Sequence, residues 1–117
     1  MMTEGLAMLF CITANFTPKA LNAIRQNPKS NQRDSVEQLV KAAGGKLVAM
    51  YGTMTEGPGA LAIIDVDPIS AAAITGTLAS SDGFQNIKMA RLWTQEEVTA
   101  SREKRVQIHG SYKAPGQ

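Results

Sequence analysis

Four residues have side chains suited to holding a small polar or aromatic ligand: Tyr51, Lys88, Arg91 and Trp93. Lysine and arginine bind carboxylates or phosphates, and aromatic rings attract cations or stack on flat ligands. Lys88 has the opposite strand parity to Arg91 and Trp93, so these three cannot all face one pocket. The alternative is that these charges are solvated at sheet edges, where they discourage edge pairing, and that Trp93 only fills a packing gap.

The sequence contains no arrangement typical of a Cys/His metal site or of a nucleophilic triad. It has one cysteine, Cys11, and one histidine, His109, in a polar C-terminal segment. Asp65 and Asp67 flank the end of an apolar strand, where Asp67 is placed to cap a helix. We predict no metal and no cofactor, and we interpret Cys11 as a packing residue of a strand.

A glycine-rich step, Gly57-Pro58-Gly59, raises the possibility of a phosphate-binding loop. Such a loop needs glycines that open a helix, so that amides and the helix dipole converge on the anion. Here the step leads into the apolar run 60–66, which is typical of a strand. The pattern therefore predicts a hairpin turn and not a phosphate site.

Composition limits the classes of partner. The chain has 117 residues and a net charge of +2. Residues 98–117 carry four basic residues against one acidic residue, so the excess charge belongs to the tail, and nucleic-acid binding is not expected. The apolar run 6–14 is too short to span a bilayer and has no positive segment before it. With a single cysteine, we expect a cytoplasmic protein without membrane attachment.

The order of the periodic segments predicts the fold. Strands are expected at 8–14, 46–54, 60–66 and 84–93, and helices at 18–27, at 33–43 after a break at Pro28, and at 68–79. Thr94 and Glu97 form a capping box that predicts a short helical turn. The order is that of a ferredoxin-like βαββαβ domain of the α+β class, a four-stranded antiparallel sheet with its helices on one face. We place this domain at residues 1–97 and a basic C-terminal tail or arm at 98–117.

The first and third strands are apolar at both parities, although helices can cover only one sheet face. A second copy, packed sheet against sheet, is the simplest cover for the other face. We therefore expect a homodimer or a higher homo-oligomer and assign Phe10 and Ile12 to its interface. Val106 and Ile108 are the aliphatic residues of the tail beyond Arg102, and we expect them to contact a neighbouring subunit.

Several quoted stretches together resemble a known family. They are "MLFCITANFTPKALNAI", "NPKSNQRDSVEQLVKAAGGKLVAMY" and "NIKMARLWTQEEV", and their order and spacing over 8–98 resemble the GYD domain family of small bacterial proteins. The resemblance implies a ferredoxin-like fold of the dimeric α/β-barrel type and no generally established activity. Gly59 and Ala60 stand where the family has its Tyr and Asp, so no role of those side chains transfers to this chain.

Three functional hypotheses follow. The first is a homo-oligomeric module without enzymatic activity, with room for a small ligand between sheet and helices. The second is a cofactor-free enzyme resembling the dimeric α/β-barrel monooxygenases and isomerases, which would use Tyr51, Lys88 or Arg91. The third is an assembly component that acts through its C-terminal tail.

Overall fold

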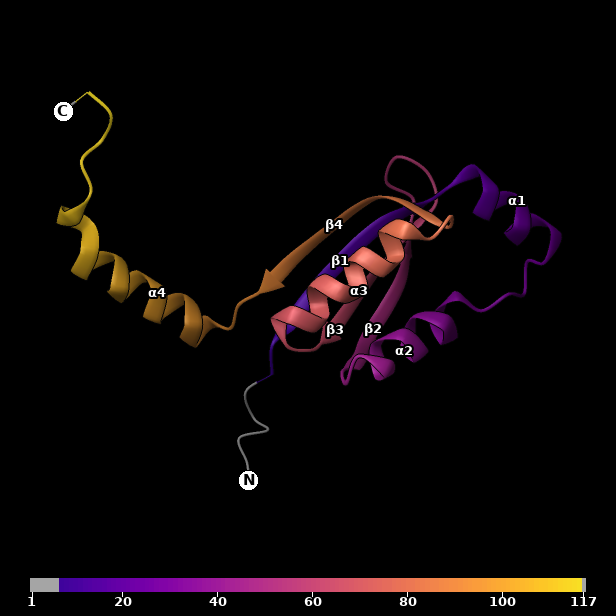
Figure 1. Ribbon diagram of the computed structural model, residues 1–117, viewed down its shortest axis with the longest axis horizontal. Coiled ribbons are helices and arrows are strands. Elements are labelled where there is room, and N and C mark those ends of the chain that lie inside the picture. The colour runs from indigo at the N-terminus through magenta and orange to yellow at the C-terminus, as the bar shows by residue number, and fades with distance from the viewer. Residues whose placement is uncertain (1–6, 117) are drawn as a thin grey trace.

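The computed structural model describes residues 7–116, which form a four-stranded antiparallel sheet with helices against one face (Figure 1). The elements run β1 (Leu9–Phe16), α1 (Pro18–Gln26), α2 (Gln32–Ala42), β2 (Lys46–Thr53), β3 (Gly59–Asp65), α3 (Pro68–Ser80), β4 (Phe84–Leu92), α4 (Gln95–Ile108) and the 3₁₀ turn η1 (His109–Ser111). The strand order β2-β3-β1-β4 places β1 and β3 in the centre. This confirms the predicted ferredoxin-like arrangement, with its first crossover divided into α1 and α2.

Helix starts are set by the caps that the sequence predicts. Thr17 accepts a hydrogen bond from the Ala20 amide (3.1 Å), and Asp67 accepts one from the Ser70 amide (3.0 Å). In both helices a proline occupies the first turn. Proline is tolerated there because N–H groups of the first turn have no acceptor within the helix. The connection between α1 and α2 contains Pro28, as the break in the pattern indicates.

The core lies between the sheet and helices α2 and α3. Val40, Ile64 and Ile74 are almost fully enclosed there. Phe10 and Ile12, each 5% exposed, belong to the same core. Their assignment to a subunit interface is therefore wrong, because the even positions of β1 face the helices. The odd positions of β1 face the other way.

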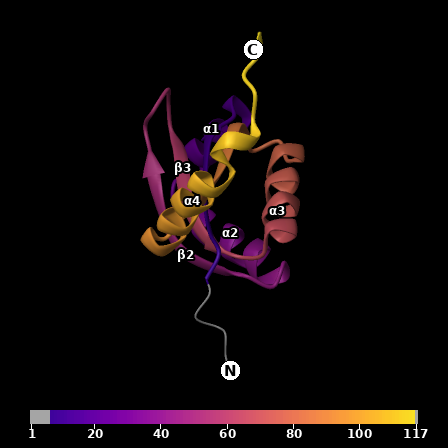
Figure 2. The same ribbon diagram turned by 90° about the vertical axis from the view of Figure 1, so that its left-hand side faces the viewer.

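The odd positions of β1 lie on a face that no helix of the described chain covers, and we call it the open face (Figure 2). The strand register aligns its side chains in rows across the sheet. One row is Tyr51, Leu61, Thr13 and Lys88, the next is Ala49, Ile63, Cys11 and Ala90, and a third includes Asp65, Leu9 and Leu92. The centre of this face is apolar, and its charged residues lie at its margins.

Helix α4 corrects the prediction of a short turn followed by an irregular tail. It runs 14 residues without interruption across the expected boundary at 97/98. The helix projects away from the sheet, and none of its residues is buried (Figure 1). The radius of gyration is consequently 18.1 Å, whereas a compact domain of 100 residues has a radius of about 13 Å. Neither α4 nor any other described helix has the length and apolar character needed to cross a membrane.

Gly59, at the start of β3, allows a close approach between two central strands. A Cβ atom there would overlap the carbonyl oxygen of Ala14 and press on the backbone of Asn15. The residue is buried, so the neighbouring strand has no free space into which to move. Glycine at this position is therefore required by the packing of β1 on β3.

We expect Gly59→Ala to lower the free energy of unfolding by about 1–3 kcal/mol, because an inserted methyl group forces backbone displacement. Urea denaturation followed by circular dichroism measures the change. Gly76→Ala is the matched control, since a Cβ at Gly76 meets no atom within 4 Å and alanine favours the helix. Equal stability of the two variants would contradict the packing argument.

Candidate functional site

The four residues predicted to bind a ligand divide between two places. Tyr51 and Lys88 lie on the open face, at opposite ends of the same row across the sheet. Arg91 pairs with Phe10 across β1 and β4, so it lies on the helix side, as its parity indicates. Trp93 follows the end of β4 and stacks on Arg91. The structure thus brings Arg91 and Trp93 together and leaves the other two residues apart from them.

Arg91, Trp93 and Glu97 form a compact junction between β4 and α4. The Arg91 Nη2 atom donates to Glu97 Oε2 at 2.7 Å, and its guanidinium carbon lies 4.0 Å from the centre of the Trp93 ring. The two charged side chains are only 24% and 33% exposed. An ion pair with this degree of shielding and a stacked partner holds its geometry better than one in open solvent.

The same glutamate caps α4. Glu97 Oε1 accepts from the Thr94 amide at 3.0 Å, and the Thr94 hydroxyl accepts from the Glu97 amide at 3.1 Å, which completes the predicted capping box. Glu97 therefore joins the first turn of α4 to the end of the sheet through one carboxylate. This junction sets the direction in which α4 leaves the domain.

Arg91 is largely committed to this structural role. Its guanidinium is engaged by both Glu97 and Trp93, and its Nε atom is buried without an acceptor among the described residues. The adjoining cleft is lined mainly by apolar side chains from the beginning of β1 and the end of β4, including Leu9 and Leu92. An apolar group can pack against the surface of this cleft. The positive charge of Arg91 beside it is neutralised by Glu97.

The interior between sheet and helices has little free space. A cavity of about 20 Å³ lies among Ile12, Val40 and Ile74, and its lining is entirely apolar. This volume is about that needed for one water molecule, and an apolar void of this size stays dry. An organic ligand between sheet and helices, as the sequence led us to consider, would have to displace core side chains.

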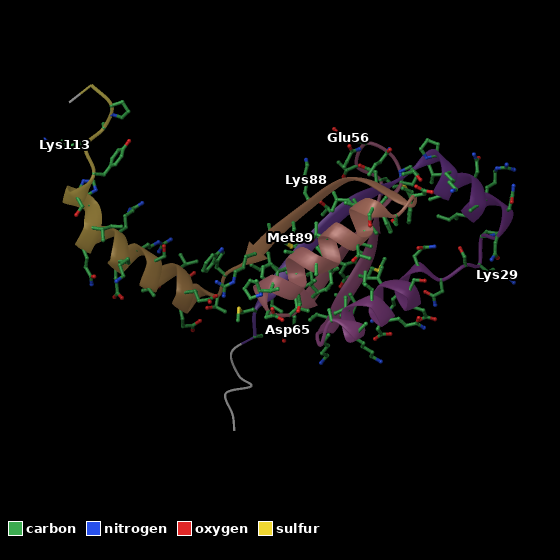
Figure 3. All side chains as sticks on the ribbon, viewed as in Figure 1. Lys29, Glu56, Asp65, Lys88, Met89 and Lys113 are labelled. Carbon is green, nitrogen blue, oxygen red and sulfur yellow. The ribbon has the colours of Figure 1, made fainter. Side chains whose placement is uncertain are left out.

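A second cavity, of about 210 Å³, lies at the end of the open face where the β2–β3 hairpin approaches β4. We call it the Lys88 pocket. Its lining residues come from β1, β2, β3, β4 and the hairpin: Thr13, Ala14, Asn15, Thr53, Thr55, Glu56, Leu61, Asn86 and Lys88. In Figure 3, Lys88 extends from β4 on the side where the hairpin carries Glu56.

Asn15 ties the walls of this pocket together. Its Nδ2 atom donates to the carbonyl oxygens of Thr55 (2.9 Å) and Gly57 (3.2 Å), and its Oδ1 atom accepts from Asn86 Nδ2 (3.3 Å). One side chain thus connects β1, the hairpin and β4. Sequence reasoning missed this site because its residues come from segments far apart in the chain, and a lone asparagine at a strand end has no distinctive pattern.

Glu56 and Asn86, both in this pocket, have left-handed backbone conformations with φ of 56°. They are the two non-glycine residues with positive φ in the described part of the chain. Asn86 lies where the pairing of β1 with β4 shifts between Thr13 and Asn15, so it forms a β-bulge. Within residues 7–116, no three His, Cys, Asp or Glu side chains are grouped as a metal site would require.

Comparison with known proteins gives the family. The profile of the GYD domain matches residues 10–101, which is most of the chain. The chain belongs to the GYD domain family. No match is found among curated proteins.

The GYD domain also has a structural likeness to a solved protein. The solution structure of the C-terminal domain of the MgtC protein from Mycobacterium tuberculosis superimposes with a TM-score of 0.55, over 79% of this chain and 94% of that domain. The sequences are 12% identical, so this likeness supports the ferredoxin-like fold and nothing further. In this GYD domain, Gly59 lies where any side chain would strike the backbone of β1.

The junction predicts a pH dependence of α4. Hydrogen bonding from the Thr94 amide and the charge of Arg91 lower the pKa of Glu97 below its ordinary value of 4.5. A lowered folded-state pKa stabilises the helix start fully above pH 4.5, and the stabilisation is lost as pH falls through the lowered value. We expect the Cα chemical shifts of residues 95–101 to lose helical character below pH 4.5.

Two variants test the cause. Glu97→Gln keeps a residue that can complete the capping box but removes the charge, so it should abolish most of this acid transition. Glu103→Gln, on the exposed part of the same helix, should leave the transition unchanged. An acid transition that persists in Glu97→Gln would assign it to another group.

Proposed function

We propose that this GYD domain works as a homodimeric module whose two copies pack their open faces together. The observation that carries the proposal is the apolar centre of that face, where Leu9, Cys11, Leu61 and Ile63 project from the two central strands and no helix within residues 7–116 covers them. These side chains are only partly exposed because neighbours on the same sheet shield them. Covering them removes apolar surface from water and gains about 25 cal/mol for each Å².

The geometry of the face suits a second copy. Two sheets pack about 10 Å apart with interdigitating side chains, and a stable interface buries about 800 Å² on each partner. Lys88 lies on the edge strand β4 and Asp65 lies at the end of β3, so both charged residues are toward the margin of the face, where a polar rim is usual. The same patch serves both partners in a two-fold dimer, so no second type of surface is needed.

The cofactor-free enzyme hypothesis has less support. Such an enzyme needs an enclosed pocket with several polar groups that converge on the reacting atoms. The cavity between sheet and helices is small and apolar, and Arg91 is already paired with Glu97. Tyr51 and Lys88 lie at opposite edges of the sheet, so one subunit does not bring them to a common substrate.

A second function, assembly through α4, is favoured by the exposure of that helix. An isolated helix of about 14 residues is marginal in water, and α4 buries no residue of its own. Its first turn carries Glu96 and Glu97, whereas Arg102, Lys104 and Arg105 follow toward its C-terminal end. Antiparallel contact between two copies of α4 would bring opposite charges together and oppose the helix dipoles.

We expect Ile63→Glu to convert a native dimer into a monomer, because a carboxylate at the centre of the open face would be buried without a partner. Sedimentation velocity measures the mass, and the dispersion of an amide NMR spectrum confirms that the variant is folded. Ile69→Glu is the matched control: Ile69 is 81% exposed on α3, so the dimer should persist. A native protein that is monomeric over the accessible concentration range would reject the proposal.

Removal of residues 102–117 distinguishes packing of the open faces from contact between copies of α4. The sheet, α2 and α3 lie outside the deleted segment, so we expect the unfolding midpoint and the dimer to survive. If α4 joins dimers, light scattering will show that assemblies larger than a dimer disappear. A truncated protein with unchanged assembly size would leave α4 without this role.

A further inference from the structure

We propose that the Lys88 pocket binds a small monocarboxylate. The pocket belongs to one subunit and uses residues outside the junction between β4 and α4. Its volume of about 210 Å³ is below the range of about 300–1,000 Å³ typical of drug-sized ligands. A ligand with a few heavy atoms fits this space.

The groups left free in the pocket suit an anion. Its side-chain hydrogen bonds run through Asn15 and use the main-chain oxygens of Thr55 and Gly57. The Lys88 ammonium and the hydroxyls of Thr13 and Thr53 remain without a hydrogen-bonding side-chain partner among the described residues. An ammonium and hydroxyl donors together bind a carboxylate through charge-assisted hydrogen bonds.

The charges of the pocket disfavour a ligand with more than one negative charge. Lys88 supplies one positive charge, and Glu56 on the opposite wall supplies a negative one. A phosphate or a dicarboxylate would bring a second negative charge close to Glu56, which is unfavourable. Leu61, which lies on the open face, gives the lining an apolar part suited to the short alkyl part of a carboxylic acid.

The walls are built to hold this shape. Left-handed backbone at a non-glycine residue is unfavourable and persists where surrounding contacts enforce it. Glu56 and Asn86 both adopt it, and the Asn15 side chain bonds to Asn86 and to the hairpin that contains Glu56. Preorganisation of this kind lowers the entropy lost when a small ligand binds.

The site does not depend on the dimer. Thr13, Leu61 and Lys88 lie in one row of the open face of a single chain, so a second copy is not needed to form the pocket. Binding to the monomeric Ile63→Glu variant therefore tests the pocket separately from the proposed function. Binding to the dimer alone would overturn the assignment of the site to one subunit.

Titration of the full chain with propionate, followed by amide NMR shifts, tests the ligand class. We expect saturable shifts that include residues 13, 55, 86 and 88, and no such shifts with the neutral isostere propionamide. Inorganic phosphate is the competing probe. Stronger binding of phosphate, equal binding of propionamide, or the absence of saturable shifts with propionate would each overturn the proposal.

Variants identify the groups that hold the ligand. Lys88→Gln should weaken propionate binding by roughly tenfold or more, since a hydrogen bond to a charged group contributes that much. Lys88→Arg should retain part of the affinity because it keeps the charge. Lys41→Gln, an exposed lysine on α2, is the control and should bind as the native protein does. Unchanged affinity in Lys88→Gln would reject the pocket.

Discussion

The uneven coverage of the sheet governs the rest of the structure. Helices α2 and α3 enclose Phe10, Ile12 and Ile64 on one side of β1 and β3, while no described helix covers Leu9, Cys11 and Ile63 on the other side. Both sets are apolar because both strands are central. The described domain buries one apolar face of its central strands and leaves the other partly exposed, which is why we propose that a second copy covers it.

The β2–β3 hairpin packs against the end of β1 and forms one wall of the Lys88 pocket. Gly59 lets β3 lie against the backbone of β1 at Ala14, and this close approach brings the hairpin to Asn15. Asn15 then links the hairpin to the bulge at Asn86, which produces a polar pocket at the end of an apolar face.

Helix α4 is held by its first turn alone. Glu97 serves the capping box and the ion pair with Arg91, and Trp93 covers the guanidinium. The junction orients the helix without burying it, so the rest of α4 is presented to solvent or to another molecule. Because none of its residues is buried, α4 contributes nothing to the core.

The sequence by itself determined the order of the elements, the central strands, the caps at Thr17, Asp67 and Thr94 and the family, because each depends on local periodicity or on a short motif. It did not predict that α4 continues to Ile108, since a polar helix lacks the apolar stripe that marks helices packed on a core. Only the tertiary structure decided that the even positions of β1 face the helices. The same structure placed Lys88 beside the hairpin and away from Arg91, because strand register and side-chain direction follow from which face the helices cover.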